Sequence, residues 1–235
     1  MITLMISDTI KTLNSELPAT VKLVAVSKFH PFEAIEEAYQ AGQRIFAESR
    51  PQELLAKVRR LEEIRSEMGE PDYMADIEWH FIGHLQTNKL KMVLPYVSLV
   101  QSVDSVRLLE AIDKWGVVNG KVVNVLLEPH VAAEETKQGF SRDEVVEILR
   151  DAAGYSHICF RGIMGMATFT DDTDVVRGDF AALCAIFDYC RDKFPSLKDS
   201  FTELSIGMSD DYPIAVEYGS TMVRIGSMIF GVREY

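Results

Sequence analysis

The stretch VKLVAVSKFHPFEAIEEAYQAGQRIFAES (21–49) contains the unit from which the fold is predicted. Residues 21–28 and 44–49 are short and rich in branched or aromatic side chains, which is typical of buried parallel strands. The segment between them reads as a helix, and Gly42 stands where its C-terminal cap is expected. The stretch therefore predicts a strand–helix–strand unit with parallel strands.

The same alternation continues along the chain. Six further strands are predicted, at 78–84, 98–104, 122–130, 159–168, 202–208 and 221–225. Helical patterns fill the gaps; Ser141 followed by Glu144, for example, predicts a capping box at the start of a helix. Before the first strand, Ile6, Ile10 and Leu13 share one face of an additional N-terminal helix.

Eight strand–helix units within 235 residues favour a closed (β/α)8 TIM barrel, predicted as a single domain over 1–235. An open doubly wound sheet remains the alternative, because periodicity alone cannot show that the sheet closes. In a barrel, functional residues are expected at the C-terminal ends of the strands.

The composition limits the classes of partner and compartment. The formal net charge of −12 argues against nucleic acid or an anionic membrane as the main partner, so a phosphate ligand would need a local set of donors. No stretch approaches the roughly 18 apolar residues of a membrane helix. The N-terminal segment carries acids and no long apolar run, which is unlike a signal peptide, so a soluble cytoplasmic protein is expected.

Neither the cysteines nor the histidines predict a metal site. The three cysteines, Cys159, Cys184 and Cys190, lack metal-type spacing and argue against a disulfide framework. His80 and His84 are four residues apart, a spacing that binds zinc on a helix, but their segment reads as a strand with no adjacent acid.

Lys28 is predicted as the last residue of the first strand, on the same face as Val24 and Val26, so that it points into the barrel mouth. Partial burial lowers the pKa of a lysine, and the neutral amine can attack a carbonyl. The alternative is a lysine whose ammonium group simply extends to solvent.

The predicted strands 7 and 8 end in a candidate phosphate site. Barrels often bind phosphate between the loops after these strands. Ser209 offers a hydroxyl from the first loop, Gly226 allows close approach of the backbone, and Ser227 offers an N–H and a hydroxyl.

Arg224 lies in strand 8 just before this site. A guanidinium only donates hydrogen bonds, so opposite a pyridine nitrogen it would keep that nitrogen unprotonated. The alternative is an arginine in a buried ion pair, with Glu217 or Asp210.

These residues fall within motifs that resemble the pyridoxal phosphate homeostasis proteins, the YggS-like or PROSC family. The resemblance runs from about Val21 to Tyr235. The motifs that carry it are AVSK (25–28), WHFIGHLQTNK (79–89), ETKQGF (135–140), RGIMGM (161–166), SIGMSDDYPIAVEYGSTMVRIGSMIFG (205–231) and REY (233–235). The family is similar to the barrel domain of bacterial alanine racemase without its second domain.

The resemblance implies pyridoxal 5′-phosphate (PLP) as the cofactor and assigns a role to individual residues. Lys28 would hold PLP as a Schiff base, Ser209, Gly226 and Ser227 would contact its phosphate, Arg224 would face the pyridine nitrogen, and Met164 would pack near the ring. Family members usually carry Gly-Glu-Asn where this chain has Ala47-Glu48-Ser49. Ser49 could replace that asparagine at the phenolic oxygen only with a shorter reach.

The function implied by the resemblance is PLP homeostasis: a monomeric protein that buffers the cofactor and delivers it to apo-enzymes without catalysis of its own. One alternative is a small PLP enzyme resembling a racemase, which needs an acid–base group on each face of the substrate. Lys28 could serve one face, and Tyr212 is the nearest candidate for the other. A third alternative is a Schiff-base aldolase that uses Lys28 directly.

Overall fold

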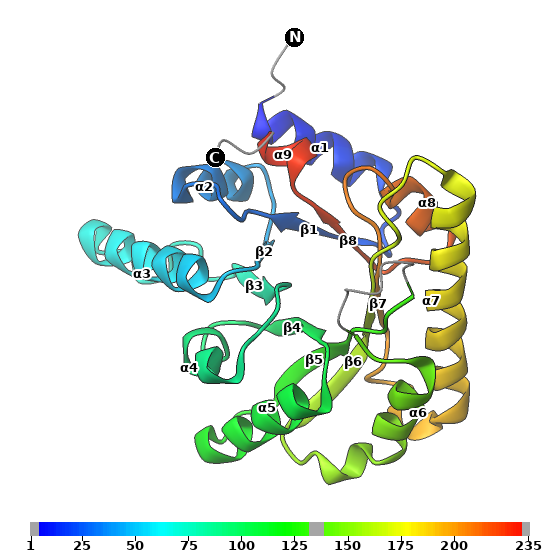
Figure 1. The fold of residues 1–235 in the computed structure, drawn as a ribbon. Helices are drawn as coiled ribbons and strands as arrows, with labels where there is room; N and C mark the ends of the chain where they lie inside the picture. The colour runs from blue at the N-terminus through cyan, green and yellow to red at the C-terminus, as the bar shows by residue number, and fades with distance from the viewer. Residues whose placement is uncertain (1–4, 132–138, 232–235) are drawn as a thin grey trace.

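Eight parallel strands close into a barrel in the order in which they occur along the chain, and helices surround it (Figure 1). The computed structural model describes residues 5–131 and 139–231, so most of the ETKQGF motif and the REY motif lie outside the described residues. The strands are β1 (Lys22–Val26), β2 (Ile45–Glu48), β3 (Glu78–Phe81), β4 (Leu99–Val103), β5 (Val123–Leu127), β6 (Ile158–Met164), β7 (Glu203–Ser205) and β8 (Met222–Ile225). Since β1 pairs with β8, the closed barrel is confirmed over the open sheet.

The helices follow the predicted alternation. They are α1 (Ile6–Glu16), α2 (Phe32–Gln40), α3 (Pro51–Met68), α4 (Leu90–Val93), α5 (Val106–Asn119), α6 (Arg142–Arg150), α7 (Thr173–Lys193), α8 (Tyr212–Glu217) and α9 (Ser227–Phe230). The predicted N-terminal helix is confirmed as α1, which buries Ile10 and Leu13. The predicted capping box is also present, with Ser141 and Glu144 at the start of α6. No described helix is both long enough and apolar enough to cross a membrane.

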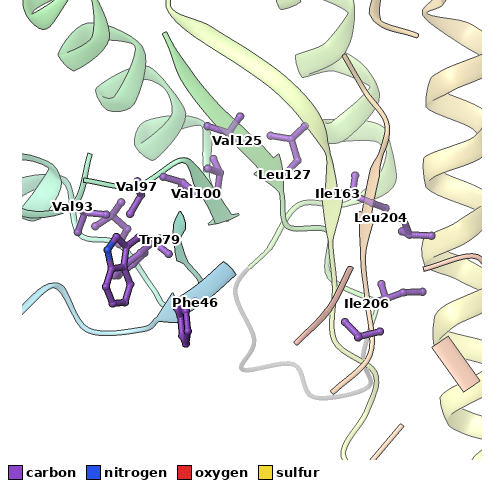
Figure 2. Packing of buried hydrophobic residues seen from close by; sticks show 14 of the residues in the cluster. Phe46, Trp79, Val93, Val97, Val100, Val125, Leu127, Ile163, Leu204 and Ile206 are labelled. Carbon is purple, nitrogen blue, oxygen red and sulfur yellow. The ribbon is translucent and has the colours of Figure 1, made fainter. Parts of the chain in front are cut away.

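Alternation along each strand divides the apolar side chains between two cores. The larger core lies between the strands and the surrounding helices, and Figure 2 shows part of it. Its members include Phe46, Trp79, Val100, Val125, Leu127, Ile163 and Leu204. The smaller core consists of Val24, Val26, Ala47, Leu99, Leu126, Met164 and Met222. Neighbouring positions such as Phe46 and Ala47 fall in different cores, as the two-residue period of a strand requires.

The prediction that Lys28 is the last residue of the first strand is wrong. Strand β1 ends at Val26, and Lys28 lies in the turn that follows. The turn forms because the amide of His30 donates to the carbonyl of Ser27 at 3.1 Å. Phe29 then takes a left-handed backbone conformation with φ 68°, which is uncommon for a residue other than glycine.

Candidate functional site

A cavity of about 260 Å³ opens at the C-terminal ends of the strands and collects six of the seven predicted site residues. The six are Lys28, Met164, Ser209, Arg224, Gly226 and Ser227. The volume lies just below the range of about 300–1,000 Å³ that is usual for ligand pockets, so it suits one small molecule. The segments that supply these residues lie far apart in sequence, and closure of the barrel is what brings them together.

Ser49 is the predicted site residue that does not line this cavity. It follows β2, and its backbone lies against Gly83: a Cβ atom at position 83 would stand 2.1 Å from the Ser49 carbonyl oxygen. The close approach of these two backbones accounts for the glycine. The structure therefore places Ser49 beside the loop after β3, and its predicted contact with a cofactor stays a prediction.

The loops after β7 and β8 meet at one end of the cavity. The amide of Gly226 donates to Ser209 Oγ at 3.4 Å, and the amide of Arg224 donates to the Gly207 carbonyl at 2.9 Å. Gly226 also lies close to β1, because a Cβ atom there would stand 3.1 Å from the Val26 carbonyl oxygen. The result is a compact set of neutral N–H and O–H donors, the kind of group that binds phosphate.

The loop after β7 is stabilised by a carboxylate. Asp211 is half-buried, and its Oδ1 accepts from the amide of Met208 at 2.5 Å. Burial raises the pKa of this carboxyl group. Asp211 therefore supports the turn that carries Ser209.

Arg224 is buried beside the cavity and donates to β7 and to the residue that follows β6. Its Nη1 bonds to the Ser205 carbonyl at 2.7 Å and to Ser205 Oγ at 2.8 Å, and its Nη2 bonds to the Gly165 carbonyl at 2.8 Å. Burial lowers the pKa of Arg224 to about 10, so the group is still protonated at neutral pH. The alternative ion pair with Glu217 is not formed, because Glu217 pairs with Arg177 at 2.6 Å.

A chain of hydrogen bonds connects Arg224 to His80 across the inside of the barrel. Ser205 Oγ accepts from Arg224 and donates to Gln101 Oε1 at 2.7 Å, and Gln101 Nε2 lies 2.9 Å from Nδ1 of His80. Burial lowers the pKa of His80 to about 3, so its Nδ1 is an acceptor at neutral pH. Sequence reasoning missed Gln101 and Ser205, although a glutamine inside a predicted buried strand was a usable signal.

A second buried polar cluster fixes the backbone just before Lys28. Ser27 Oγ donates to Glu48 Oε1 at 2.6 Å, while Lys57 Nζ donates to Glu48 Oε1 at 2.5 Å and to the Ser27 carbonyl at 2.7 Å. On the other side, the amide of Phe29 donates to Glu53 Oε2 at 2.9 Å. Residues on both sides of Lys28 are therefore held by side chains of β2 and α3. These positioning residues were also missed from the sequence.

Two further aromatic residues line the cavity. His30 stacks on Phe230 with ring centroids 5.2 Å apart, and Phe169 is 91% exposed at the rim. Tyr212, the candidate for a second acid–base group, instead directs its hydroxyl to Glu16 Oε2 at 3.3 Å and does not line the cavity. Among the described residues, no group of three His, Cys, Asp or Glu side chains could hold a metal ion.

Comparison with known proteins identifies relatives over almost the whole chain. The family model described as alanine racemase, N-terminal domain, matches residues 5–234. The pyridoxal phosphate homeostasis protein of Haemophilus influenzae is 35% identical over 216 residues, covering 92% of this chain and 86% of that protein. The protein of the same name from Escherichia coli K12 is 33% identical over 220 residues, covering 93% and 88%.

Solved structures of related proteins superpose on this chain over nearly its whole length. PipY of Synechococcus elongatus, solved with PLP bound, superposes with a TM-score of 0.85 at 33% identity, covering 96% of this chain and all of that one. Alanine racemase from E. faecalis superposes with a TM-score of 0.70 at 17% identity, covering 97% of this chain and 57% of the racemase. The second likeness establishes the racemase-like barrel fold alone.

Proposed function

The chain belongs to the pyridoxal phosphate homeostasis protein family, and from that premise we propose that it binds PLP reversibly in the cavity at the barrel mouth. The observation that carries the proposal is that Lys28 and the donors Ser209, Gly226 and Ser227 line one cavity of suitable size. An aldehyde and a phosphate of one small ligand could be held there together. PLP, when bound, supplies an aldehyde that reacts with amines and a pyridine ring that can accept electrons.

Each end of the proposed ligand has residues that suit it. The neutral donors around Gly226 suit the phosphate. Met164, in the smaller core, offers an apolar contact for the ring. Arg224 is suited to the pyridine nitrogen because it keeps its proton at neutral pH and cannot accept one. Lys28 is proposed as the residue that holds PLP as a Schiff base.

The proposed role is buffering and delivery of PLP to apo-enzymes in the cytoplasm, without catalysis. A racemase-like reaction needs an acid–base group on each face of the substrate carbon. Tyr212 points to Glu16 rather than into the cavity, so this alternative loses its nearest candidate for the second face. A PLP-binding protein with Lys28 as a reversible attachment point accounts for the residues that do line the cavity.

The test compares wild type with Lys28→Ala after incubation with PLP and removal of unbound cofactor. Wild type should show the visible absorption band of imine-linked pyridoxal, and borohydride should fix the pyridoxyl group to the peptide that contains Lys28. Lys28→Ala should lose both signals, while the matched control Lys91→Ala, which removes an exposed lysine of α4, should keep both. Wild type that shows no band even with added PLP would contradict the proposal.

A second measurement separates the binder from the enzyme. PLP-loaded wild type is incubated with a panel of L-amino acids in deuterium oxide, and exchange of the α-hydrogen is followed by proton NMR. Exchange no faster than with free PLP supports the homeostasis role. Rapid, stereochemically scrambling exchange abolished by Lys28→Ala would favour the racemase-like alternative.

A further inference from the structure

A second and larger cavity, of about 810 Å³, lies at the same end of the barrel and is not used by the proposed function. It is bounded by the loop after β3, by the residues that follow β4 and begin α5, and by Gly139 before α6. Its described lining is mostly polar and includes His84, Gln86, Asn88, Asp104, Ser105 and Arg107. This lining shares no residue with the cavity that contains Lys28. The volume falls within the usual range of ligand pockets, about 300–1,000 Å³.

A histidine–carboxylate pair forms one wall of this cavity. Asp104, whose side chain is only 5% exposed, accepts from His84 Nδ1 at 2.8 Å and from Ser105 Oγ at 3.0 Å. Each carboxylate oxygen therefore has a partner. Because Nδ1 donates in this bond, Nε2 is the ring nitrogen left for a ligand, and it donates to an oxyanion when the ring carries its second proton. The His84 side chain is 54% exposed, so that nitrogen can be reached from outside.

The charges of the described lining favour an anion. Arg107 is exposed and contributes a permanent positive charge, while Gln86 and Asn88 contribute amide donors. The one carboxylate of the lining, Asp104, is buried and already bonded to His84 and Ser105. Arg107 and Asp104 cancel in formal charge, but both oxygens of Asp104 are taken up by His84 and Ser105, so the lining presents amide donors and the positive charge of Arg107 to a ligand.

We infer that this cavity is a second ligand site that binds a small oxyanion, a molecule carrying a phosphate or carboxylate group. Arg107 is the charged contact, and His84 is the contact whose ring orientation is fixed by Asp104. Since the two cavities share no lining residue, the inference stands or falls separately from PLP binding at Lys28.

The test is an NMR titration of the full chain, with inorganic phosphate in one arm and succinate in the other, and chloride used to keep the ionic strength constant. The imidazole ring signals of His84 are assigned by their loss in His84→Gln. They should shift saturably with at least one of the two anions, with a dissociation constant of about 1 mM or tighter. Saturation by phosphate alone, or by succinate alone, identifies which oxyanion the site prefers.

Two charge-matched variants decide whether the cavity is the site. Arg107→Ala should weaken the binding of the saturating anion by about tenfold or more, since the variant removes a charge-assisted contact. Lys114→Ala removes one positive charge from an exposed position on the same helix outside the cavity, and should leave the affinity unchanged. No saturable shift of His84 with either anion, or equal weakening by both variants, would overturn the inference. PLP absorption in Arg107→Ala should match wild type, which separates this result from the proposed function.

Discussion

His80 is a buried neutral imidazole whose burial has a consequence for stability. Its pKa is lowered to about 3 by removal from water, while in the unfolded chain it titrates near its ordinary value of about 6.5. Between these values the unfolded chain binds a proton that the folded chain does not. The stability contributed by neutral His80 is therefore present above about pH 6.5 and is lost as the pH falls toward about 3.

His80→Gln should remove this pH dependence, because glutamine can still accept from Gln101 Nε2 but does not titrate. The free energy of unfolding of wild type minus that of the variant should be flat above about pH 7 and fall by about 1.4 kcal/mol per pH unit below about pH 6. Urea denaturation at a series of pH values measures the free energy of unfolding of wild type and of the variant. Two stability curves that stay parallel down to about pH 4.5 would show that the histidine is protonated in the folded protein.

The residues that line or support the cavity were partly predictable from the sequence, and there is a physical reason why some were predicted and others were not. Lys28, Arg224 and Gly226 could be placed because strand ends meet at one mouth in a closed barrel, so the topology alone brings them together. Lys57 could not be placed. It stands beside Val58 in an amphipathic helix, where a lysine normally faces solvent, and only the buried Glu48 opposite it reveals its role.

At the scale of elements, the contact between β6 and β7 depends on Gly162. The register between β5 and β6 shifts near this residue, as at a β-bulge, and its φ of 151° is a conformation that side chains disfavour. A Cβ atom at position 162 would lie 1.7 Å from the Glu203 carbonyl oxygen on β7. This overlap is with backbone, so it can be relieved only by moving the strands apart.

Gly162→Ala should therefore lower the free energy of unfolding by about 3 kcal/mol or more. The matched control is Gly178→Ala on α7, where nothing lies within 4 Å of the added methyl group and the conformation is helical. That control should raise the stability by about 0.5–1 kcal/mol, because alanine loses less backbone freedom than glycine in a helix. Urea unfolding measures both variants. Equal stabilities for Gly162→Ala and wild type would mean that β6 and β7 can separate without cost.

The number and order of the strands were predictable, while their ends were not. Alternation and composition predicted all eight strands, and their pairing order follows the chain. The predicted strand 159–168, however, continues beyond the end of β6 at Met164. Apolar residues continue past that point because Met166 lines the cavity, and periodicity does not distinguish a strand residue from a cavity residue.

At the scale of the whole molecule, the net charge affects whether copies of the chain associate. Like-charged copies of a chain with net charge −12 repel one another, which opposes association at low ionic strength. The described surface carries one group of exposed apolar side chains close in sequence, namely Val117, Val118 and Val122 at the end of α5 and in the loop after it. Such a group is where a weak contact between copies would form if the repulsion were screened.

We therefore expect the 235-residue chain to be a monomer. Sedimentation equilibrium should give the mass of one chain over about two orders of magnitude in protein concentration, at low salt and at about 0.15 M salt, where screening is stronger. A mass that rises with concentration only at the higher salt would contradict the expectation. In that case Val118→Asp, which places a charge at the most exposed of the three valines, should restore the single-chain mass if this group forms the contact. A dimer that persists in Val118→Asp would assign the contact to another face of the barrel.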